Sequence, residues 1–518
     1  MDGIMARTLS FGVLGVSGIP VHVEVFGVNG LPGMEIIGLP DTSVRESKDR
    51  VYAAIVNSGR AMHPKRITVN LAPADLRKEG PSFDLPIAVG VMISMGEMSP
   101  CPEIDMERIA LFGELSLDGW VQPIVGALPM VMSAKENGIR EVILPAGNAQ
   151  EIACVDGITV YPAAHLREVI DHLEGRKRIV PLEMTPYEAI VAEQRTRAID
   201  LSNVKGQQGA RRALEVAAAG GHNLLMIGVP GSGKTMLARA LPGILPPMSF
   251  EEAMETTMIH SIAGRLKTGG VLITERPFSA PHHNASVASL VGGGPNAAPG
   301  EASLAHNGVL FLDELPEFNR SALEALRQPL EDGEVTVSRV RRTSTYPSRF
   351  MLVTAMNPCP CGYYGSSRRA CRCTPIEIRR YLDRISGPLL DRIDLQIEVD
   401  AVPVSEIQST APAESSATVR ERVTEARLRQ RERYKGTAIH CNAQLDSKGM
   451  PQFCEMSRDA QQLLNAAVEN MHMSMRAYSR VIKVARTIAD LDRAERIEMN
   501  HLAEAIQYRE LDMKYWMK

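Results

Sequence analysis

The sequence predicts an α/β protein that ends in a helical segment. Residues 1–175 alternate short strand-like runs with helical stretches, and residues 201–400 repeat this alternation. From residue 421 onward the apolar residues recur at helical spacing. Strands that alternate with helices are typical of α/β domains, and 518 residues suffice for several domains of about 100–200 residues each.

The first segment, residues 1–175, is predicted to form one α/β domain. Its clearest strands are "RITVNLAP", "ALFGELSL" and "EVILP", and its clearest helices are "DTSVRESKDRVYAAIVNSG" and "ALPMVMSAKENG". The N-terminus is apolar enough to resemble a signal peptide, but glycines interrupt the run and "VHVEVFGV" alternates as a half-buried strand does. We therefore expect folded structure at the N-terminus.

Two connectors separate the remaining segments. Residues 176–200 mix charge with two prolines, and residues 401–420 are rich in serine, alanine and proline. The first composition suits an interdomain connector, and the second suits a linker or an exposed excursion. We expect a second α/β domain over residues 201–400 and a helical domain over residues 421–518.

The charge and hydropathy of the chain exclude several classes of partner. The net charge is −4, which excludes a globally basic nucleic-acid-binding protein and restricts any such contact to a local patch. The sequence has no run of about 18 uncharged apolar residues, so we expect no membrane partner and a cytoplasmic location.

A glycine-rich motif lies between the apolar run Leu224–Ile227 and a helix-forming run. It reads G-x-x-x-x-G-K-T, and its residues are Gly228, Val229, Pro230, Gly231, Ser232, Gly233, Lys234 and Thr235. In this pattern backbone N–H groups surround phosphate oxygens, the lysine reaches the β- and γ-phosphates, and the threonine hydroxyl ligates Mg²⁺. In this context the motif predicts a site for ATP and Mg²⁺. The alternative is a loop with only a structural role.

Two adjacent acids, Asp313 and Glu314, end the apolar run "VLFLDE" downstream of this loop. A buried charge is costly unless it has a partner. A P-loop ATPase places a metal-binding acid at such a strand end, followed by an acid that orients the attacking water. We therefore expect Asp313 to hold Mg²⁺ and Glu314 to orient water. The alternative is an acidic strand end that caps the following helix.

With both motifs in place, the chain resembles the AAA+ ATPases and, within them, the magnesium-chelatase-like YifB/ComM family. The similarity covers nearly the whole chain and rests on "PFSAPHHNASVASLVGGGPNAAPGEASLAHNGVLFLDELPEF", "NPCPCGYYG", "RRYLDRISGPLLDRIDL" and "MRAYSRVIKVARTIADL". The resemblance implies a central AAA+ αβα domain followed by a helical lid. It also implies a homohexameric DNA-dependent ATPase with helicase activity, which promotes branch migration in natural transformation.

The resemblance implies roles for polar residues outside the phosphate-binding loop. Asn357, which ends "FMLVTAMN", is similar to sensor 1, a polar group beside the γ-phosphate. Arg392 in "PLLDRIDL" resembles the arginine finger that reaches the ATP of the neighbouring subunit. Arg476 in "SMRAYSR" resembles sensor 2, with Arg480 as its rival, and Gln207 matches the position that lines the adenine pocket. For each arginine the alternative is a surface ion pair.

A predicted hairpin, "EDGEVTVSRVRRTSTYPSRF", carries the candidate DNA contacts. In this class of AAA+ protein such a hairpin points into the pore of the ring. Arg339, Arg341 and Arg342 would then contact phosphates of single-stranded or branched DNA without reading its sequence. The alternative is a solvated basic turn. The resemblance places His282 and His283 in an insertion near the same pore.

Four cysteines crowd into "CPCGYYGSSRRACRC", just after Asn357, and they are Cys359, Cys361, Cys371 and Cys373. Four thiolates could close a tetrahedral Zn²⁺ site that staples this loop, although C-x-C differs from the usual C-x₂₋₄-C spacing. The alternative is a set of free reduced thiols. In either case the position predicts a structural role.

The N-terminal segment resembles the proteolytic domain of Lon, which has a fold like domain 2 of ribosomal protein S5. "KEGPSFDLPIAV" puts Ser82 at the position of the nucleophile. "GELSLDGWVQPIVGALPM" puts Met130 where the family has a lysine, and Lys135 lies more than one helical turn further on. Because a thioether cannot take up the proton of the serine, we expect a Lon-like fold without peptidase activity.

Three functions follow from these features. The first is a ring-forming ATPase that translocates DNA, the second is a chelatase-type motor that remodels a protein or assists metal insertion, and the third is an ATP-dependent protease. Met130 argues against the third. The ATPase residues alone permit both the DNA-translocating ATPase and the chelatase-type motor. The arginine-rich hairpin and the family resemblance favour the DNA-translocating ATPase.

Overall fold

The computed structural model describes residues 4–193, 198–266, 272–294, 297–339, 342–366, 369–402 and 413–516. The chain divides into two compact units. The first comprises Met1–Gln194 and Phe250–Thr274, and the second comprises Arg195–Ser249 and Glu275–Lys518. Within the described residues, no helix combines the length and the apolar character that crossing a membrane requires.

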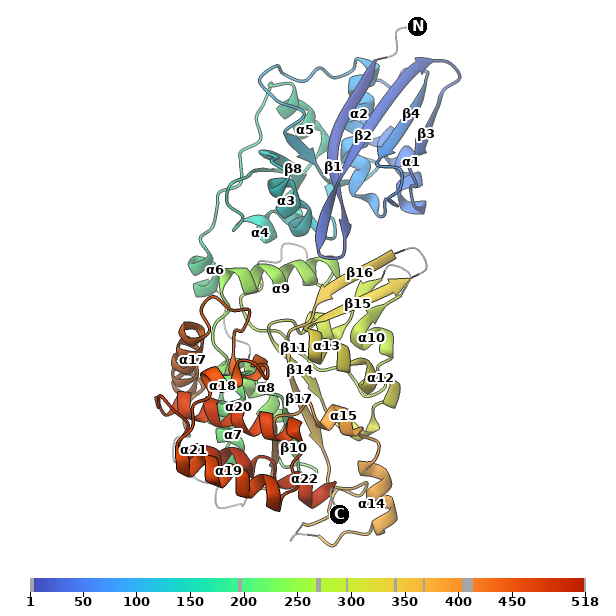
Figure 1. The fold of residues 1–518 in the computed structure, drawn as a ribbon. Coiled ribbons are helices and arrows are strands. Elements are labelled where there is room, and N and C mark those ends of the chain that lie inside the picture. The colour runs from blue at the N-terminus through green and yellow to red at the C-terminus, as the bar shows by residue number, and fades with distance from the viewer. Residues whose placement is uncertain are drawn as a thin grey trace. The chain divides into compact units, whose positions relative to one another are not determined.

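A mixed seven-stranded sheet forms the centre of the first unit (Figure 1). Its order is β3-β4-β2-β1-β5-β8-β9, with β1 antiparallel to β2 and with β5, β8 and β9 parallel. Its strands are β1 (Met5–Leu14), β2 (Ser17–Asn29), β3 (Gly33–Ile37), β4 (Lys65–Ala72), β5 (Ile109–Leu111), β8 (Glu141–Pro145) and β9 (Thr159–Ala163). A short ribbon of β6 (Glu114–Leu115) and β7 (Val121–Gln122) lies outside this sheet.

Helices bury the sheet of the first unit. Helix α2 (Asp84–Met95) is apolar along almost its whole length and is buried nearly all round. Helix α1 (Thr42–Asn57) begins after Asp41, whose carboxylate accepts the N–H of Val44 at 2.8 Å. The other helices of this unit are α3 (Ala127–Glu136), α4 (Ala149–Ile152), α5 (Leu166–Leu173), α6 (Tyr187–Glu193) and α9 (Phe250–Ile262).

Helix α9 corrects the segment boundaries expected from the sequence, because it packs in the first unit although it lies within residues 201–400. The sulfur of Met254 contacts the thiol of Cys154 at 3.8 Å, and the Ser261 hydroxyl donates to Glu151 at 3.0 Å. The alternation of strands and helices gave no sign of this return of the chain. Helix α6 likewise forms inside the expected connector, where the ring of Tyr187 contacts that of Phe250.

A parallel five-stranded sheet forms the centre of the second unit, in the order β11-β14-β17-β10-β18. The strands are β10 (Leu224–Ile227), β11 (Phe278–Ser279), β14 (Val309–Leu312), β17 (Met351–Met356) and β18 (Leu395–Glu398). Because the strands are parallel, their carboxyl ends meet at one edge, where α/β sheets bind ligands. The predicted α/β class is confirmed.

Helices and two small ribbons complete the second unit. The helices around the sheet are α7 (Gln208–Gly220), α8 (Lys234–Ile244), α10 (Val287–Val291), α11 (Glu301–Leu304), α12 (Arg320–Ala325), α13 (Arg327–Asp332), α14 (Pro375–Leu382) and α15 (Gly387–Leu390). One ribbon joins β12 (Gly292–Gly293) to β13 (Ala298–Pro299), and the other joins β15 (Glu334–Arg339) to β16 (Arg342–Pro347).

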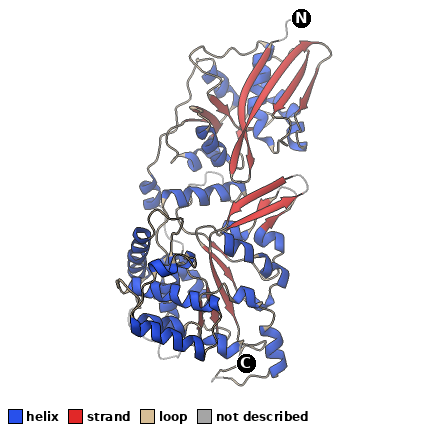
Figure 2. Ribbon diagram, in the orientation of Figure 1, coloured by secondary structure: helices blue, strands red, loops and turns tan. Residues whose placement is uncertain are grey.

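The described residues after position 412 are helical, as predicted (Figure 2). The helices are α17 (Ser416–Arg433), α18 (Met450–Phe453), α19 (Arg458–Asn470), α20 (Met475–Leu491), α21 (Met499–Gln507) and α22 (Glu510–Tyr515). Helix α17 begins earlier than expected, because the Ser415 hydroxyl accepts the N–H of Thr418 and caps the helix within the expected linker.

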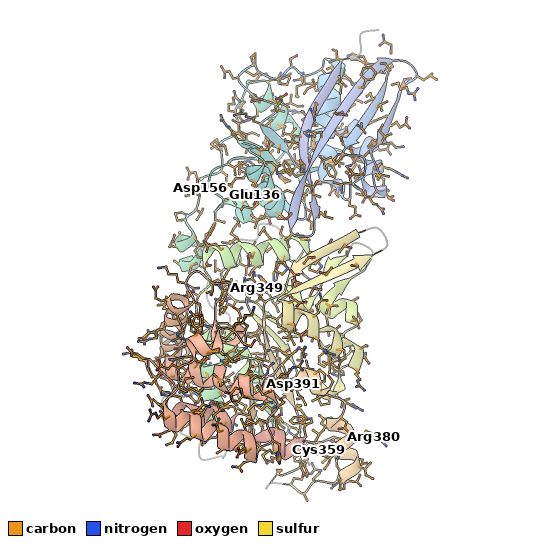
Figure 3. The ribbon with its side chains drawn as sticks, viewed as in Figure 1. Glu136, Asp156, Arg349, Cys359, Arg380 and Asp391 are labelled. Carbon is orange, nitrogen blue, oxygen red and sulfur yellow. The ribbon has the colours of Figure 1, made fainter. Side chains whose placement is uncertain are left out.

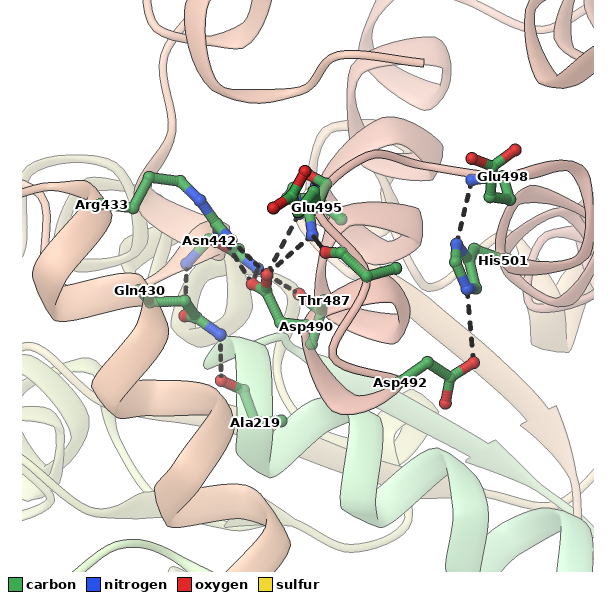
Figure 4. A network of polar contacts seen from close by, with 12 residues as sticks. Ala219, Gln430, Arg433, Asn442, Thr487, Asp490, Asp492, Glu495, Glu498 and His501 are labelled. Atoms are coloured by element: carbon green, nitrogen blue, oxygen red, sulfur yellow. Dashed lines mark hydrogen bonds and ion pairs between the residues drawn. The ribbon is translucent and has the colours of Figure 1, made fainter. Parts of the chain in front are cut away.

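A buried carboxylate joins the C-terminal helices to one another (Figure 4). Asp490 on α20 accepts hydrogen bonds from Arg433 and Asn442, and it also pairs with Arg486 at 2.9 Å. Because a buried charge needs such partners, this network fixes α17 against α20.

Candidate nucleotide-binding site

The glycine-rich loop Gly228–Thr235 joins β10 to α8. Gly231 has a φ of 75° and Gly233 a φ of 92°, angles at which a side chain would strain the backbone. The eleven-residue helix α8 begins at Lys234, so the unpaired N–H groups of its first turn border the loop. The hydroxyl of Ser232 is buried and has no hydrogen-bond partner among the described residues. A helix N-terminus beside an unpaired polar atom suits a phosphate.

The ammonium group of Lys234 is buried among neutral oxygens. Its Nζ donates to the carbonyl oxygens of Gly228 at 2.7 Å and Val229 at 3.0 Å, and to Asn357 Oδ1 at 3.3 Å. Burial lowers the pKa of Lys234, and the charges of Asp313 and Glu314 oppose this shift. A phosphate oxygen would replace a neutral acceptor of this ammonium group with an anionic one, which turns a hydrogen bond into an ion pair.

Thr235 and Asp313 place two oxygen ligands side by side. The Thr235 hydroxyl donates to Asp313 Oδ2 over 2.8 Å. Asp313 directly follows β14, and Thr235 lies in the first turn of α8. Hydroxyl and carboxylate oxygens are ligands that Mg²⁺ prefers, so this pair fits the expected metal.

Glu314 occupies a strained backbone position. Its φ is 53°, which is uncommon for a residue with a side chain, and its N–H donates to Asp313 Oδ1 at 3.0 Å. Its carboxylate lies 3.3 Å from Nδ1 of His283 and is 55% exposed. Asp313 is half-buried, so the two acids follow a buried strand without being buried themselves. Strain of this kind persists at functional sites.

Asn357 and Gln207 both contact the loop region. Asn357 follows β17, the strand between β14 and β10, and its side chain accepts the hydrogen bond from Lys234. The Gln207 amide donates to the carbonyl of Ser232 at 3.3 Å and to that of Asp400. The structure thus brings five predicted residues to one edge of the sheet, and they are Lys234, Thr235, Asp313, Glu314 and Asn357.

Successive parts of the chain match three family descriptions. Residues 23–148 match subunit ChlI of Mg-chelatase, residues 200–407 match magnesium chelatase, subunit ChlI, and residues 413–509 match the C-terminal part of that subunit. The uncharacterized protein YifB of Escherichia coli strain K12 is 45% identical over 500 residues, with 96% of each chain covered. The competence protein ComM of Haemophilus influenzae is 44% identical over 506 residues, which cover 98% of this chain and 97% of that protein. The chain belongs to the YifB/ComM family. It is therefore a magnesium-chelatase-like AAA+ protein, a class that uses ATP and Mg²⁺.

About a third of this YifB/ComM-family chain is also similar to Lon. Lon protease 2 of Bacillus subtilis is 29% identical over 167 residues, which make up 31% of this chain. Ser82 is buried in the short helical turn Pro81–Phe83, and Met130 is a core residue of α3, only 3% exposed. The position that the resemblance gives to the lysine is thus an apolar one.

Arg392 is not presented freely on the surface. It is 6% exposed and forms an ion pair with Glu331 at the end of α13, while its Nη1 donates to the carbonyl of Pro388. Burial lowers the pKa of Arg392, and the charges of neighbouring arginines add to this. A role in the site of a neighbouring subunit would require this ion pair to open.

The two arginines that compete for the sensor 2 role have different surroundings. The side chain of Arg476 is 63% exposed and pairs with Asp391 at 3.0 Å. Arg480 is mostly buried and forms an ion pair with Asp394. The carboxylate of Asp394 also lies 3.3 Å from His222 Nδ1. Arg480 therefore neutralises a buried carboxylate, whereas Arg476 is open to a ligand.

The hairpin predicted around Arg341 is present. β15 pairs antiparallel with β16, and Arg339 lies opposite Arg342 where the described strands end. Arg341 and the side chains of Arg339 and Arg342 lie outside the described residues. The Tyr346 hydroxyl donates to the carbonyl of Ala297 at 2.8 Å, which fixes the hairpin to the insertion that follows β11.

The four clustered cysteines lie on the loop between β17 and α14, which Figure 3 marks with Cys359 and Arg380. Their sulfur atoms all lie within 4.8 Å of one another. Hydrogen bonds from backbone N–H groups, first that of Arg372, lower the pKa of Cys361 to about 6, whereas burial raises that of Cys359 to about 12. The cluster fits a thiolate-bound metal.

Three contacts of the site were missed by sequence reasoning. His283 touches Glu314, Glu331 holds Arg392, and Gly362 lies against Pro230. In each pair the partners are far apart in the chain, so spacing carries no signal. His283, Glu331 and Gly362 all lay in segments that the sequence had singled out, but none of these contacts was predicted.

Proposed function

We propose that this chain forms a hexameric ring in the cytoplasm and couples ATP hydrolysis to movement along single-stranded or branched DNA. This motor would act as a helicase in branch migration, during recombination or natural transformation. The proposal rests on a cluster of five residues at one edge of a parallel sheet, and they are Lys234, Thr235, Asp313, Glu314 and Asn357. Full-length similarity to a competence protein supports the DNA substrate.

Each residue of the cluster has a separate chemical role in this proposal. Lys234 and the N–H groups of α8 bind the β- and γ-phosphates. Thr235 and Asp313 hold Mg²⁺, which when bound neutralises charge on the phosphates. Glu314 orients the attacking water and accepts its proton, and Asn357 positions that water beside the γ-phosphate.

The DNA part of the proposal is tested by ATP turnover with and without DNA. Single-stranded or branched DNA is expected to stimulate turnover several-fold, and raised salt is expected to weaken the effect because phosphate contacts carry it. The double variant Arg341→Ala/Arg342→Ala should lose the stimulation and keep basal turnover. A matched control, Arg66→Ala/Arg108→Ala, removes two exposed arginines of the first unit and should keep the stimulation by DNA.

A different result would favour a second function. If no DNA stimulates turnover, a chelatase-type motor that remodels a protein or assists metal insertion becomes the better interpretation, because the chain matches magnesium chelatase descriptions. The same ATP-hydrolysing residues serve both functions, so Lys234→Ala inactivates either motor.

The cysteine cluster is proposed to hold one structural Zn²⁺ through Cys359, Cys361, Cys371 and Cys373. A ligand set of four thiolates is typical of structural zinc sites, and the alternative is four reduced thiols. Metal analysis of protein purified without chelators should find about one zinc per chain. A content well below that would refute the site.

The N-terminal domain is proposed to lack peptidase activity, because Met130 replaces the base that would activate Ser82. Reagents that label serine proteases should leave Ser82 unmodified. Labelling of Ser82 would overturn this part of the proposal.

A further inference from the structure

The loop between β17 and α14 has little apolar core of its own. Among its described residues, 357–366 and 369–374, only Pro358, Cys359 and Gly362 are buried. Burial of three small residues offers little free energy to offset the entropy of ordering such a loop, which costs about 1–2 kcal/mol for each residue. Something other than hydrophobic packing must hold it in place.

The thiol geometry supplies that constraint. Cys359 Sγ lies 3.4 Å from Cys361 Sγ and 3.7 Å from Cys371 Sγ, and Cys361 Sγ lies 3.6 Å from Cys371 Sγ. With zinc–sulfur bonds of about 2.3 Å, a tetrahedral site has sulfur–sulfur edges of about 3.8 Å. The N–H of Cys361 also donates to Cys373 Sγ at 3.4 Å, a contact that orients a thiolate ligand.

The same loop lies directly against the phosphate-binding loop. Gly362 has a φ of 85°, and a Cβ atom placed there would come within 2.7 Å of the ring of Pro230 and 3.9 Å of Asn357 Cγ. Gly362 is therefore in van der Waals contact with the phosphate-binding loop. The loop also begins at Asn357, whose side chain accepts a hydrogen bond from Lys234.

The opposite side of the loop is anchored to the C-terminal helix. The rings of Tyr364 and Tyr515 have centroids 6.4 Å apart, and the Tyr515 hydroxyl donates to Glu398 at the end of β18 over 3.1 Å. The cysteine loop thus spans from the phosphate-binding loop to α22.

We propose that the four-cysteine loop, closed by Zn²⁺, is a rigid brace that positions Pro230 and Asn357 for nucleotide binding. The inference rests on the proposed zinc site, and it adds that nucleotide affinity depends on the metal. Apart from Asn357, the residues of the loop take no part in the reaction itself. They act as positioning residues through Pro230 and Asn357.

Removal of zinc from the full-length protein tests this directly. A zinc-selective chelator is applied in excess Mg²⁺, and the Kd for a fluorescent ADP analogue is measured together with zinc content and amide hydrogen exchange. Loss of zinc should weaken binding about tenfold, the effect of one contact of about 1.4 kcal/mol. It should also speed exchange at residues 228–235, and added Zn²⁺ should restore both.

A pair of glycine variants separates the brace from the metal. Gly362→Ala keeps all four thiols but puts a methyl group against Pro230, so it should retain zinc and weaken ADP binding about tenfold. Gly365→Ala is the matched control, because Gly365 has a similar φ of 77° but nothing within 4 Å of a Cβ atom. It should keep both zinc and affinity.

The outcomes distinguish failure of the brace from failure of the site. Protein that contains about one zinc per chain but binds ADP equally well after zinc removal, or as the Gly362→Ala variant, overturns the brace and leaves the zinc site standing. Protein without zinc overturns both and leaves the DNA-dependent ATPase untouched.

Discussion

At the scale of single residues, similar side chains have different tasks because their surroundings differ. Arg476 and Arg480 lie one turn apart on α20, yet only Arg480 faces a fully enclosed carboxylate. Burial alone would raise the pKa of Asp394, but Arg480 and His222 hold it well below its usual range. The ionised Asp394 therefore needs Arg480 in place.

The arginine pair gives a first prediction. Arg480→Ala should destabilise the protein by about 3–5 kcal/mol, because it leaves a buried charge unpaired. Arg476→Ala should change stability by less than about 1 kcal/mol, since its ion pair is exposed, and should lower ATP turnover. Urea unfolding and ATPase assays of the two variants check this. Equal destabilisation by both would contradict the distinction.

A second prediction separates nucleotide binding from hydrolysis. Lys234→Ala should abolish tight ATP binding because it removes the cation that faces the phosphates. Glu314→Gln should bind ATP normally and hydrolyse it at least 100-fold more slowly, roughly the contribution of a general base. Binding and single-turnover assays measure the two effects. A normal hydrolysis rate in Glu314→Gln would remove the role assigned to that carboxylate.

At the scale of elements, α5 shows how a buried histidine ties the connector to the first unit. His172 is fully buried, its Nδ1 accepts the N–H of Ile179 at 3.0 Å, and its ring packs on Tyr161. Burial lowers the pKa of His172 to about 4. The folded chain therefore needs the neutral imidazole that the hydrogen bond to Ile179 also requires.

This histidine gives a third prediction, about pH. Because its pKa is lowered on folding, the unfolded chain binds more protons between pH 6.5 and about 4, and stability falls as pH drops through that window. The loss amounts to about 3 kcal/mol. His172→Asn keeps an acceptor near Nδ1 and should show a flatter pH dependence of Tm below pH 6.5, despite a lower Tm at neutral pH. An unchanged pH profile would exclude His172 as its source.

The elements also show what the sequence could predict. The run "EVILP" coincides with β8, because a short apolar run bounded by charge and proline leaves little choice. "ALFGELSL" splits into β5 and β6 at Gly113, where the apolar pattern continues but the chain turns. The motif spacing predicted the phosphate-binding loop and the acids, because local geometry fixes them. It could not predict Glu331 beside Arg392, because that contact depends on tertiary packing.

At the scale of the whole molecule, the proposed ring makes Arg392 the residue that joins one active site to the next. Glu331 forms an ion pair with this arginine, and only Asp332 and Gly333 separate it from the β15–β16 hairpin. We propose that a shift of the hairpin on DNA contact also shifts Glu331. This connection offers a route from DNA contact to hydrolysis in the neighbouring subunit.

The ring gives a fourth prediction, tested by mixing subunits. Arg392→Ala and Lys234→Ala proteins should each be inactive alone, whereas a mixture should recover part of the ATP turnover. Recovery is expected because an intact phosphate-binding loop then meets an intact arginine from its neighbour. A mixture without activity would argue for a role of Arg392 within its own subunit.

A fifth prediction concerns the partner of that arginine. Glu331→Gln should raise turnover in the absence of DNA and reduce the stimulation by DNA, because Arg392 is no longer held. The exposed neighbour substitution Glu334→Gln is the control and should leave both unchanged. Lower turnover without DNA would show that Glu331 supports the site rather than restraining Arg392.

The return of α9 to the first unit has a consequence for synthesis on the ribosome. The first unit lacks residues 250–274 until the chain has passed through the loop and helix of the nucleotide site. The hydrogen bond from Ser261 to Glu151 and the contact between Met254 and Cys154 therefore cannot form until translation has reached α9. Translation adds roughly 5–20 residues each second. The nascent chain therefore cannot complete the first unit before it has made the phosphate-binding loop and α8 of the second.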